Sequence, residues 1–99
     1  DVPLKPGMII SNEPGYYKEN NFGIRIENLI CVKESRIEGF LEFETLTLAP
    51  FHKKLINKLL LNNEQIDWIN TYHKMVYNKL NSYLSRDVKE WLIKQTKPI

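Results

Sequence analysis

Apolar and polar residues alternate with a period of two through the first half of the chain, and this alternation predicts β-strands. The clearest stretch is GIRIENLICV, residues 23–32. One face of this strand carries Ile24, Ile26, Asn28, Ile30 and Val32, with Asn28 interrupting the apolar residues. The opposite face carries Arg25, Glu27, Leu29 and Cys31. A strand with one apolar face is expected to pack that face on other elements, so we expect Ile24 and Ile26 to face helices.

Proline–glycine pairs and a slip in the pattern mark the other strands. GMIISNE, introduced by Pro6-Gly7, is a short apolar run that ends in polar residues. Pro14-Gly15 suits the centre of a type II turn, and Glu13 is expected to be extended because it precedes a proline. In FLEFETLTL, residues 40–48, the apolar phase slips between Phe43 and Leu46, which predicts a bulge near Glu44-Thr45.

The period becomes helical after Pro50. KKLINKLLL predicts a short amphipathic turn or two. A longer helix begins at Asn62 or Asn63, with Gln65 at the reciprocal position of a capping box. Its buried stripe is Ile66, Ile69, His73, Val76, Leu80 and Leu84, and its flanks are Trp68, Tyr72 and Tyr83. A last helix is predicted from Asp87, with Glu90 as its capping partner, and it stops before Pro98. The fold class is therefore α+β, with strands in residues 1–50 and helices in residues 51–99.

Composition and charge narrow the class of protein without defining its chemistry. The 99 residues are 42% hydrophobic and 26% charged, and 14 basic residues nearly balance 12 acidic ones. No basic run exceeds Lys53-Lys54, which argues against nucleic-acid binding. The single cysteine, Cys31, excludes an internal disulfide. The absence of a long apolar run or a signal-peptide pattern favours a soluble intracellular protein without a membrane span.

Two acids stand in the predicted strands, Glu13 and Glu27. If their segments pair as antiparallel neighbours, the two carboxylates meet on one face, where repulsion and lost hydration favour a bound cation. Carboxylate oxygens suit hard ions such as manganese or magnesium. The alternative is that each acid pairs with Arg25 or a lysine, or faces water. Neither histidine suits a metal site: His52 is expected at the surface of a helix start, and His73 in the core as a hydrogen-bonded histidine.

Four segments carry a specific resemblance: SNEPGYYKENNFGIRIENLICV, LEFETLTLAPF, NNEQIDWINTYHKMVYNKL and WLIKQTKPI. Together they resemble the C-terminal end of the aminopeptidase P (Xaa-Pro aminopeptidase) group of the pita-bread metallopeptidase family M24, in its long cytosolic form. The resemblance covers essentially the whole chain. It implies the C-terminal portion of a pita-bread fold, with antiparallel strands followed by C-terminal helices, and incomplete on its own.

The resemblance also implies roles for individual residues. Glu13 matches the catalytic glutamate that ligates one metal and contacts the attacking water. Glu27 matches the glutamate that bridges two metals, and Arg25 matches an arginine that holds a ligating aspartate in place. Tyr16 and Tyr17 either help to wall the site or pack structurally. The substrate-binding residues are unknown.

What the resemblance implies for function follows from this ligand set. The expected cofactor is a pair of divalent ions, manganese by family likeness, and the expected substrate is a peptide with proline as its second residue. Two aspartates and a histidine should come from an upstream part of the same enzyme, so the chain alone is expected to be inactive. A homodimer is expected. The rival interpretations are a non-catalytic pita-bread domain that binds proteins or peptides, and a helical tail that acts as an independent interaction module.

Overall fold

The computed structural model describes residues 2–99, and it divides into two compact units on either side of the Thr47–Leu48 bond. Asp1, where the first predicted unit begins, lies outside the described residues. The strands all lie in the first unit and the helices in the second. The contacts place this boundary just before Pro50.

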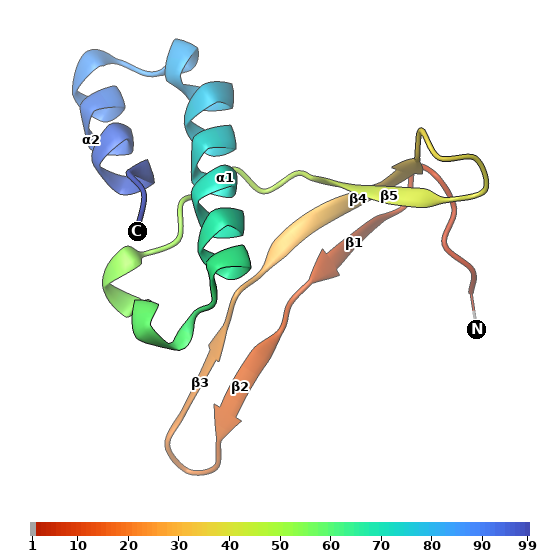
Figure 1. Ribbon diagram of the computed structural model, residues 1–99, viewed down its shortest axis with the longest axis horizontal. Helices are drawn as coiled ribbons and strands as arrows, with labels where there is room; N and C mark the ends of the chain where they lie inside the picture. Colours follow the sequence, from red (N-terminus) through yellow and green to blue (C-terminus); the bar gives the residue numbers. More distant parts are fainter. Residues whose placement is uncertain (1) are drawn as a thin grey trace. The chain divides into compact units, whose positions relative to one another are not determined.

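The first unit is built around one long antiparallel hairpin (Figure 1). Strand β1 (Ile9–Asn12) pairs with β4 (Asn28–Glu34), and β2 (Gly15–Lys18) pairs with β3 (Phe22–Arg25). Residues 19–21 form the tip, where Asn20 takes a left-handed φ of 55° and the Asn21 N–H donates to the Lys18 carbonyl. Asparagine tolerates this conformation better than most residues, which explains a tight tip without glycine.

The turn predicted at Pro14-Gly15 is wrong. The chain continues extended through this dipeptide, and Gly15 is the first residue of β2, paired with Arg25. The proline–glycine turn lies instead at Pro6-Gly7, where Gly7 has a φ of 90° and the Met8 N–H donates to the Lys5 carbonyl. Both dipeptides fit a type II turn by composition, so the residues alone do not separate them.

Strand β5 (Leu41–Thr45) adds to β4 and completes a three-stranded sheet in the order β1-β4-β5. Its register is continuous from the Glu34–Leu41 pair to the Ile30–Thr45 pair, so the bulge predicted near Glu44-Thr45 is wrong. The same register continues at Leu46, whose N–H donates to the Leu29 carbonyl. Leu46 therefore shares the face of Leu29 rather than that of Phe43, and this explains the slip in the apolar phase.

Burial in the strands follows the predicted alternation. In β4, one face is buried at Asn28, Ile30 and Val32, while the intervening residues are exposed or partly exposed. Ile24 and Ile26 lie on the continuation of that face and are half-exposed within the described chain. The expectation that they face helices stays a prediction.

The second unit begins with two short 3-10 helices, which are followed by two α-helices with a third 3-10 helix between them. The 3-10 turns η1 (Lys53–Leu55) and η2 (Lys58–Leu60) confirm the predicted short turns. Helix α1 (Asn63–Leu80) is followed by η3 (Asn81–Tyr83) and α2 (Arg86–Thr96). The capping box at the start of α1 is confirmed: the Gln65 N–H donates to Asn62 Oδ1 at 2.9 Å, and the Asn62 N–H donates to Gln65 Oε1 at 3.0 Å.

The start of α2 differs from its prediction. Ser85 is the N-cap, with no hydrogen bond from its side chain, and Asp87 lies inside the first turn. Glu90 does not reach back to a cap but accepts from Arg86 Nε at 3.3 Å, one helical turn away. The acid at Asp87 still favours the helix N-terminus through the helix dipole. The predicted end before Pro98 is confirmed, since α2 ends at Thr96.

The core of the second unit lies along the predicted stripe of α1. Tyr72, His73, Val76 and Leu92 are the buried side chains, and Phe51, Met75, Tyr77, Leu80 and Leu84 pack around this core. The position of Tyr72 corrects its assignment to a flank, because it is only 5% exposed and stacks on Phe51 with ring centroids 4.7 Å apart. Its hydroxyl donates to the Ala49 carbonyl at 2.8 Å, which satisfies the polar end of a buried aromatic ring.

Two further contacts hold the segment that leads into α1. The buried His73 accepts a hydrogen bond at Nε2 from the Phe51 N–H, 3.0 Å away. Lys53 donates from Nζ to the carbonyls of Lys94 and Lys97 at the end of α2, where a cation complements the helix dipole.

None of the helices in residues 2–99 is long and apolar enough to cross a membrane.

Candidate metal-ligand site

The register of the hairpin places Glu13 opposite Glu27. Asn12 pairs with Asn28 on one side of them and Gly15 with Arg25 on the other, and the Ile26 N–H donates to the Pro14 carbonyl at 3.1 Å. Counting inward from either pair makes the two glutamates partners. They occupy a position without mutual backbone hydrogen bonds, where antiparallel strands bring facing Cα atoms to about 4.5 Å. The ladder is interrupted here because Pro14 has no N–H to return to Ile26.

The same face of the hairpin carries the polar partners of Glu13. Arg25 donates from Nη1 to Glu13 Oε2 at 3.1 Å, and Ser11 donates from Oγ to Glu13 Oε1 at 2.8 Å. Sequence reasoning named Arg25 but missed Ser11. The spacing contained the signal, because residues two apart in a strand project from the same face. The Arg25–Glu13 pair is the contact expected from the alternative interpretation of these acids, and it is compatible with a metal role for Glu13.

Glycine and an aromatic ring shape the surface beside Arg25. A Cβ built on Gly15 would lie 2.8 Å from Arg25 Cγ and 2.9 Å from the Tyr17 hydroxyl, and one built on Gly23 would lie 2.7 Å from Tyr17 Cδ1. The Tyr17 ring therefore lies over Gly23, and the stem of Arg25 lies over Gly15. The two glycines are needed here for space rather than for an unusual φ, since neither has a positive φ.

The two tyrosines lie on opposite faces of the hairpin. Tyr17 shares the glutamate face, whereas Tyr16 packs near Phe22 on the other face, with ring centroids 6.0 Å apart. A hollow of about 320 Å³ also involves the Tyr16 side of the hairpin. Its lining residues are Pro14, Gly15, Tyr16, Ile24, Arg25 and Ile26. Neither glutamate lines this hollow, so it is separate from the candidate ligands.

The donor chemistry of the glutamate face fits part of a centre for hard divalent cations. Two facing carboxylates supply anionic oxygen ligands, the type that manganese and magnesium prefer. Within residues 2–99, no group of three or more histidine, cysteine, aspartate or glutamate side chains is placed to hold a metal ion. The residues therefore fit such a centre as two of its ligands and not as the complete set.

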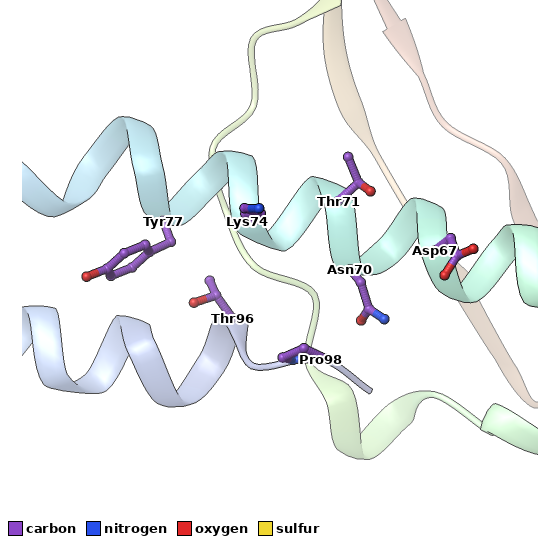
Figure 2. A pocket seen from close by; sticks show the side chains of 7 residues that line it. All are labelled: Asp67, Asn70, Thr71, Lys74, Tyr77, Thr96 and Pro98. Carbon is purple, nitrogen blue, oxygen red and sulfur yellow. The ribbon is translucent and has the colours of Figure 1, made fainter.

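A second hollow lies in the helical unit, between α1 and the end of the chain (Figure 2). Its volume is about 570 Å³, and its lining residues are Asp67, Asn70, Thr71, Lys74, Tyr77, Thr96 and Pro98. Asp67 is the one acid in this lining, and no histidine or cysteine is present. The hollow is larger than the one in the hairpin, but its side chains lack the ligands of a metal centre.

The histidines occupy the positions expected of non-ligands. His52 is exposed at the start of η1. His73 is fully buried, and burial together with the charge of Lys53 lowers its pKa below the ordinary value of 6.5. Its Nε2 is the acceptor for the Phe51 N–H, and this contact confirms a hydrogen-bonded core histidine.

Comparison with known families gives the class of protein. Residues 39–99 match the profile described as the C-terminal region of peptidase_M24, and residues 1–34 match that of metallopeptidase family M24. The chain belongs to metallopeptidase family M24. Its strands followed by helices form the C-terminal part of the pita-bread fold of this family.

Individual relatives place the chain within that family. It is 42% identical over 105 residues to aminopeptidase P1 of Arabidopsis thaliana, covering all of this chain and 16% of the relative. It is 43% identical over 107 residues to a probable Xaa-Pro aminopeptidase P of Coprinopsis cinerea, covering all of this chain and 17% of the relative. The chain thus spans about a sixth of the length of the curated relatives it matches.

A solved structure agrees with this placement. The X-prolyl aminopeptidase of Caenorhabditis elegans, described as a cytosolic enzyme with a di-nuclear active site, superposes with a TM-score of 0.81. The two chains are 35% identical, and the match covers 97% of this chain and 17% of that one.

The two family profiles divide the chain inside a sheet. The first profile ends at residue 34, the last residue of β4, and the second begins at residue 39, before β5. Yet β4 and β5 are hydrogen-bonded partners over the whole of β5. The part of this chain that matches the C-terminal region of the family therefore contributes β5 to the sheet that also contains β1 and β4.

Proposed function

We propose that this chain supplies Glu13 and Glu27 to the di-metal centre of an Xaa-Pro aminopeptidase, which removes the first residue of peptides that have proline second. The observation that carries the proposal is the register, which makes these two glutamates facing partners on one face of the hairpin. The expected upstream part of the enzyme supplies the two aspartates and the histidine that complete five protein ligands.

The two bound ions would activate a water for attack and polarise the scissile carbonyl. Glu27 would neutralise both cations with one carboxylate and so keep them close together. Glu13 would orient the attacking water through a carboxylate oxygen, accept its proton, and pass that proton to the departing amine. Arg25, which carries a permanent positive charge beside Glu13, would hold a neighbouring ligating aspartate through its remaining donors.

The test is to compare Glu27→Gln with Glu13→Gln in the full-length enzyme that contains this chain. Glu27→Gln is expected to lose bound metal as well as turnover, because a neutral amide leaves two cations to repel each other at short range. Glu13→Gln is expected to retain more metal and to lose chiefly turnover. Metal content per protein is measured beside the rate on an Xaa-Pro peptide.

Two controls make this comparison decisive. Glu34→Gln removes a carboxylate from the end of β4 in the same unit and should change neither quantity. The isolated 99-residue chain, assayed with manganese, should give no turnover because it lacks three of the expected ligands. A Glu27→Gln enzyme that retained two metals and normal activity would contradict the bridging role of Glu27. Turnover by the isolated chain would contradict the need for upstream ligands.

The rival function is a non-catalytic pita-bread domain that binds proteins or peptides. A domain without catalysis has no need for two facing acids beside an arginine, and this favours the enzyme. A wild-type full-length protein that binds Xaa-Pro peptides but never hydrolyses them, with or without added metal, would favour the rival.

Three finer expectations belong to the same proposal. The resident ions are manganese, by family likeness, and the location is cytosolic, as described for the enzyme from Caenorhabditis elegans. The enzyme is a homodimer, supported by large apolar side chains that the helical unit leaves exposed, such as Leu59 and Leu60. Metal analysis of protein purified without added metal, cell fractionation, and sedimentation of the full-length enzyme test these points separately.

A further inference from the structure

The Glu13 carboxylate is held at both of its oxygens by partners of different charge. Arg25 donates to Oε2 at 3.1 Å, and Ser11 donates to Oε1 at 2.8 Å. A carboxylate rotates easily about its last bond, so one hydrogen bond leaves its plane poorly defined. Donors at both oxygens define that plane.

The two donors respond differently to a cation. A divalent ion beside Glu13 repels the guanidinium of Arg25, because both are positive and both seek the same carboxylate. The Ser11 hydroxyl is neutral, and it uses one of the roughly four lone-pair positions of the carboxylate. It can therefore keep its hydrogen bond while the other lone pairs bind metal or water.

Ser11 is also placed by the backbone rather than by a flexible side chain. It lies in β1, two residues before Glu13, and its short side chain reaches Oε1 from the same face of the strand. Arg25 reaches Oε2 from the opposite strand through a long side chain that is about half exposed. A hydroxyl fixed by the strand loses little rotational freedom when it makes its bond.

We propose that Ser11 is a positioning residue for Glu13: with a bound cation as the second partner of the carboxylate, the Ser11 hydroxyl would fix its plane. The proposal rests on the proposed function, since it assumes that Glu13 is a metal ligand. Hydroxyl donors to an ionised acceptor are about twice as strong as neutral pairs, so this contact is strong enough to select one orientation. Its loss would leave the acid present but misdirected.

The experiment uses a matched pair in the full-length enzyme, Ser11→Thr and Ser11→Val. Threonine keeps the hydroxyl and valine replaces it with a methyl group of the same shape, so both introduce the same branching in β1. Ser11→Ala is measured as a third variant, and Ser35→Ala is the control. Ser35 lies in the same unit, and its Oγ accepts from the Ile37 N–H away from the acids.

The readouts are the dissociation constant for Mn²⁺, measured by calorimetry on metal-free protein, and kcat and KM on an Xaa-Pro peptide. Ser11→Val and Ser11→Ala are expected to weaken Mn²⁺ binding and to lower kcat by about tenfold, the lower end for partners of metal ligands. KM should change little. Ser11→Thr and Ser35→Ala should behave as the wild type.

Two results would overturn the role of Ser11. One is wild-type metal affinity and kcat in Ser11→Ala. The other is equal damage in Ser11→Thr and Ser11→Val, which would assign the effect to branching in the strand. Glu13→Gln, measured in parallel, separates this outcome from failure of the proposed function, because an active Glu13→Gln enzyme would remove the role of Glu13 itself.

Discussion

The helical unit closes a core of its own, whereas the β2–β3 end of the hairpin, next to the glutamates, buries no side chain. Tyr72, His73, Val76 and Leu92 are each at most 5% exposed, and every residue of β2 and β3 is exposed. The helices are therefore stabilised by packing within their unit. The hairpin is defined by backbone register, by glycine–aromatic contacts and by the polar bonds to Glu13.

This difference separates the residues that stabilise the helical unit from the proposed metal ligands, Glu13 and Glu27. A substitution in the helical core should lower the free energy of unfolding with little direct effect on the glutamates. A substitution on the glutamate face should alter metal binding or turnover with little cost in core packing. The four tests below address the stability side of that difference, from the largest expected effect to the smallest.

Leu92→Ala should give the largest loss of stability. Leu92 is 1% exposed, and truncating a buried leucine costs about 2–5 kcal/mol in the free energy of unfolding. The control change Lys74→Ala, at an exposed residue of α1, should cost less than about 0.5 kcal/mol. Hydrogen exchange of α1 and α2 amides in the full-length enzyme measures both. Equal effects would show that the helical unit does not depend on this core.

Gly23→Ala should disturb the hairpin through Tyr17. The new Cβ would lie 2.7 Å from the ring, and overpacking costs about 1–3 kcal/mol, with the lower end expected because this ring can turn into solvent. The same change in a Tyr17→Ala background meets no ring and should cost less. The four proteins of this double-mutant cycle are compared by hydrogen exchange of the β2 and β3 amides. If the effects of the two substitutions were additive, the added Cβ at residue 23 would not be in contact with the Tyr17 ring.

Asn62→Ala should weaken the start of α1 by about 1 kcal/mol, because it removes the acceptor of the Gln65 N–H. Ser85→Ala is the matched change at the other helix, where the N-cap side chain makes no hydrogen bond. It should change the stability of α2 by less than Asn62→Ala changes that of α1. Exchange rates of the first-turn amides give the comparison, and a larger effect at Ser85 would contradict it.

The smallest expected effect comes from pH acting on His73. Its pKa in the folded chain is below 6.5, so on acidification the unfolded state takes up a proton first. The contribution of His73 to the free energy of unfolding is therefore fully present above about pH 6.5. It declines as the pH falls towards the pKa of His73 in the folded state. The Phe51 N–H donates to His73 Nε2, so the protection of this amide against hydrogen exchange, relative to its intrinsic rate, should decrease over this range. His73→Gln, which cannot titrate, should remove that pH dependence of the protection.

Local signals in the sequence predicted most of the helical unit. The capping box at Asn62, the stripe through His73 and Val76, and the stop before Pro98 depend on residues close together in the chain, and the structure confirms them. Ser85 was missed as a cap because its neighbours Asp87 and Glu90 show the spacing of a capping box, while Glu90 pairs with Arg86 instead.

The strands were harder to predict because their pairing depends on distant residues. Alternation correctly separated the faces of residues 23–32, yet it could not tell that Pro14-Gly15 continues a strand opposite Ile26 and Arg25. The identity of the acids came from resemblance, and their facing geometry requires the register. Ser11 was missed because a lone serine in a strand has no distinctive pattern until its partner is known.

The pairing of β5 with β4 also limits where the polypeptide can be divided. A cut between residues 34 and 39, where the two family profiles meet, would divide the chain between β4 and β5. These two strands are paired over the whole length of β5. Each piece would then expose an open strand edge that favours either reassembly or aggregation. A cut at the Thr47–Leu48 bond would leave the sheet whole. The boundary between the two family profiles therefore differs from the boundary between the two structural units of this chain. Exchanging C-terminal regions between relatives should succeed only when β5 stays with its own β4.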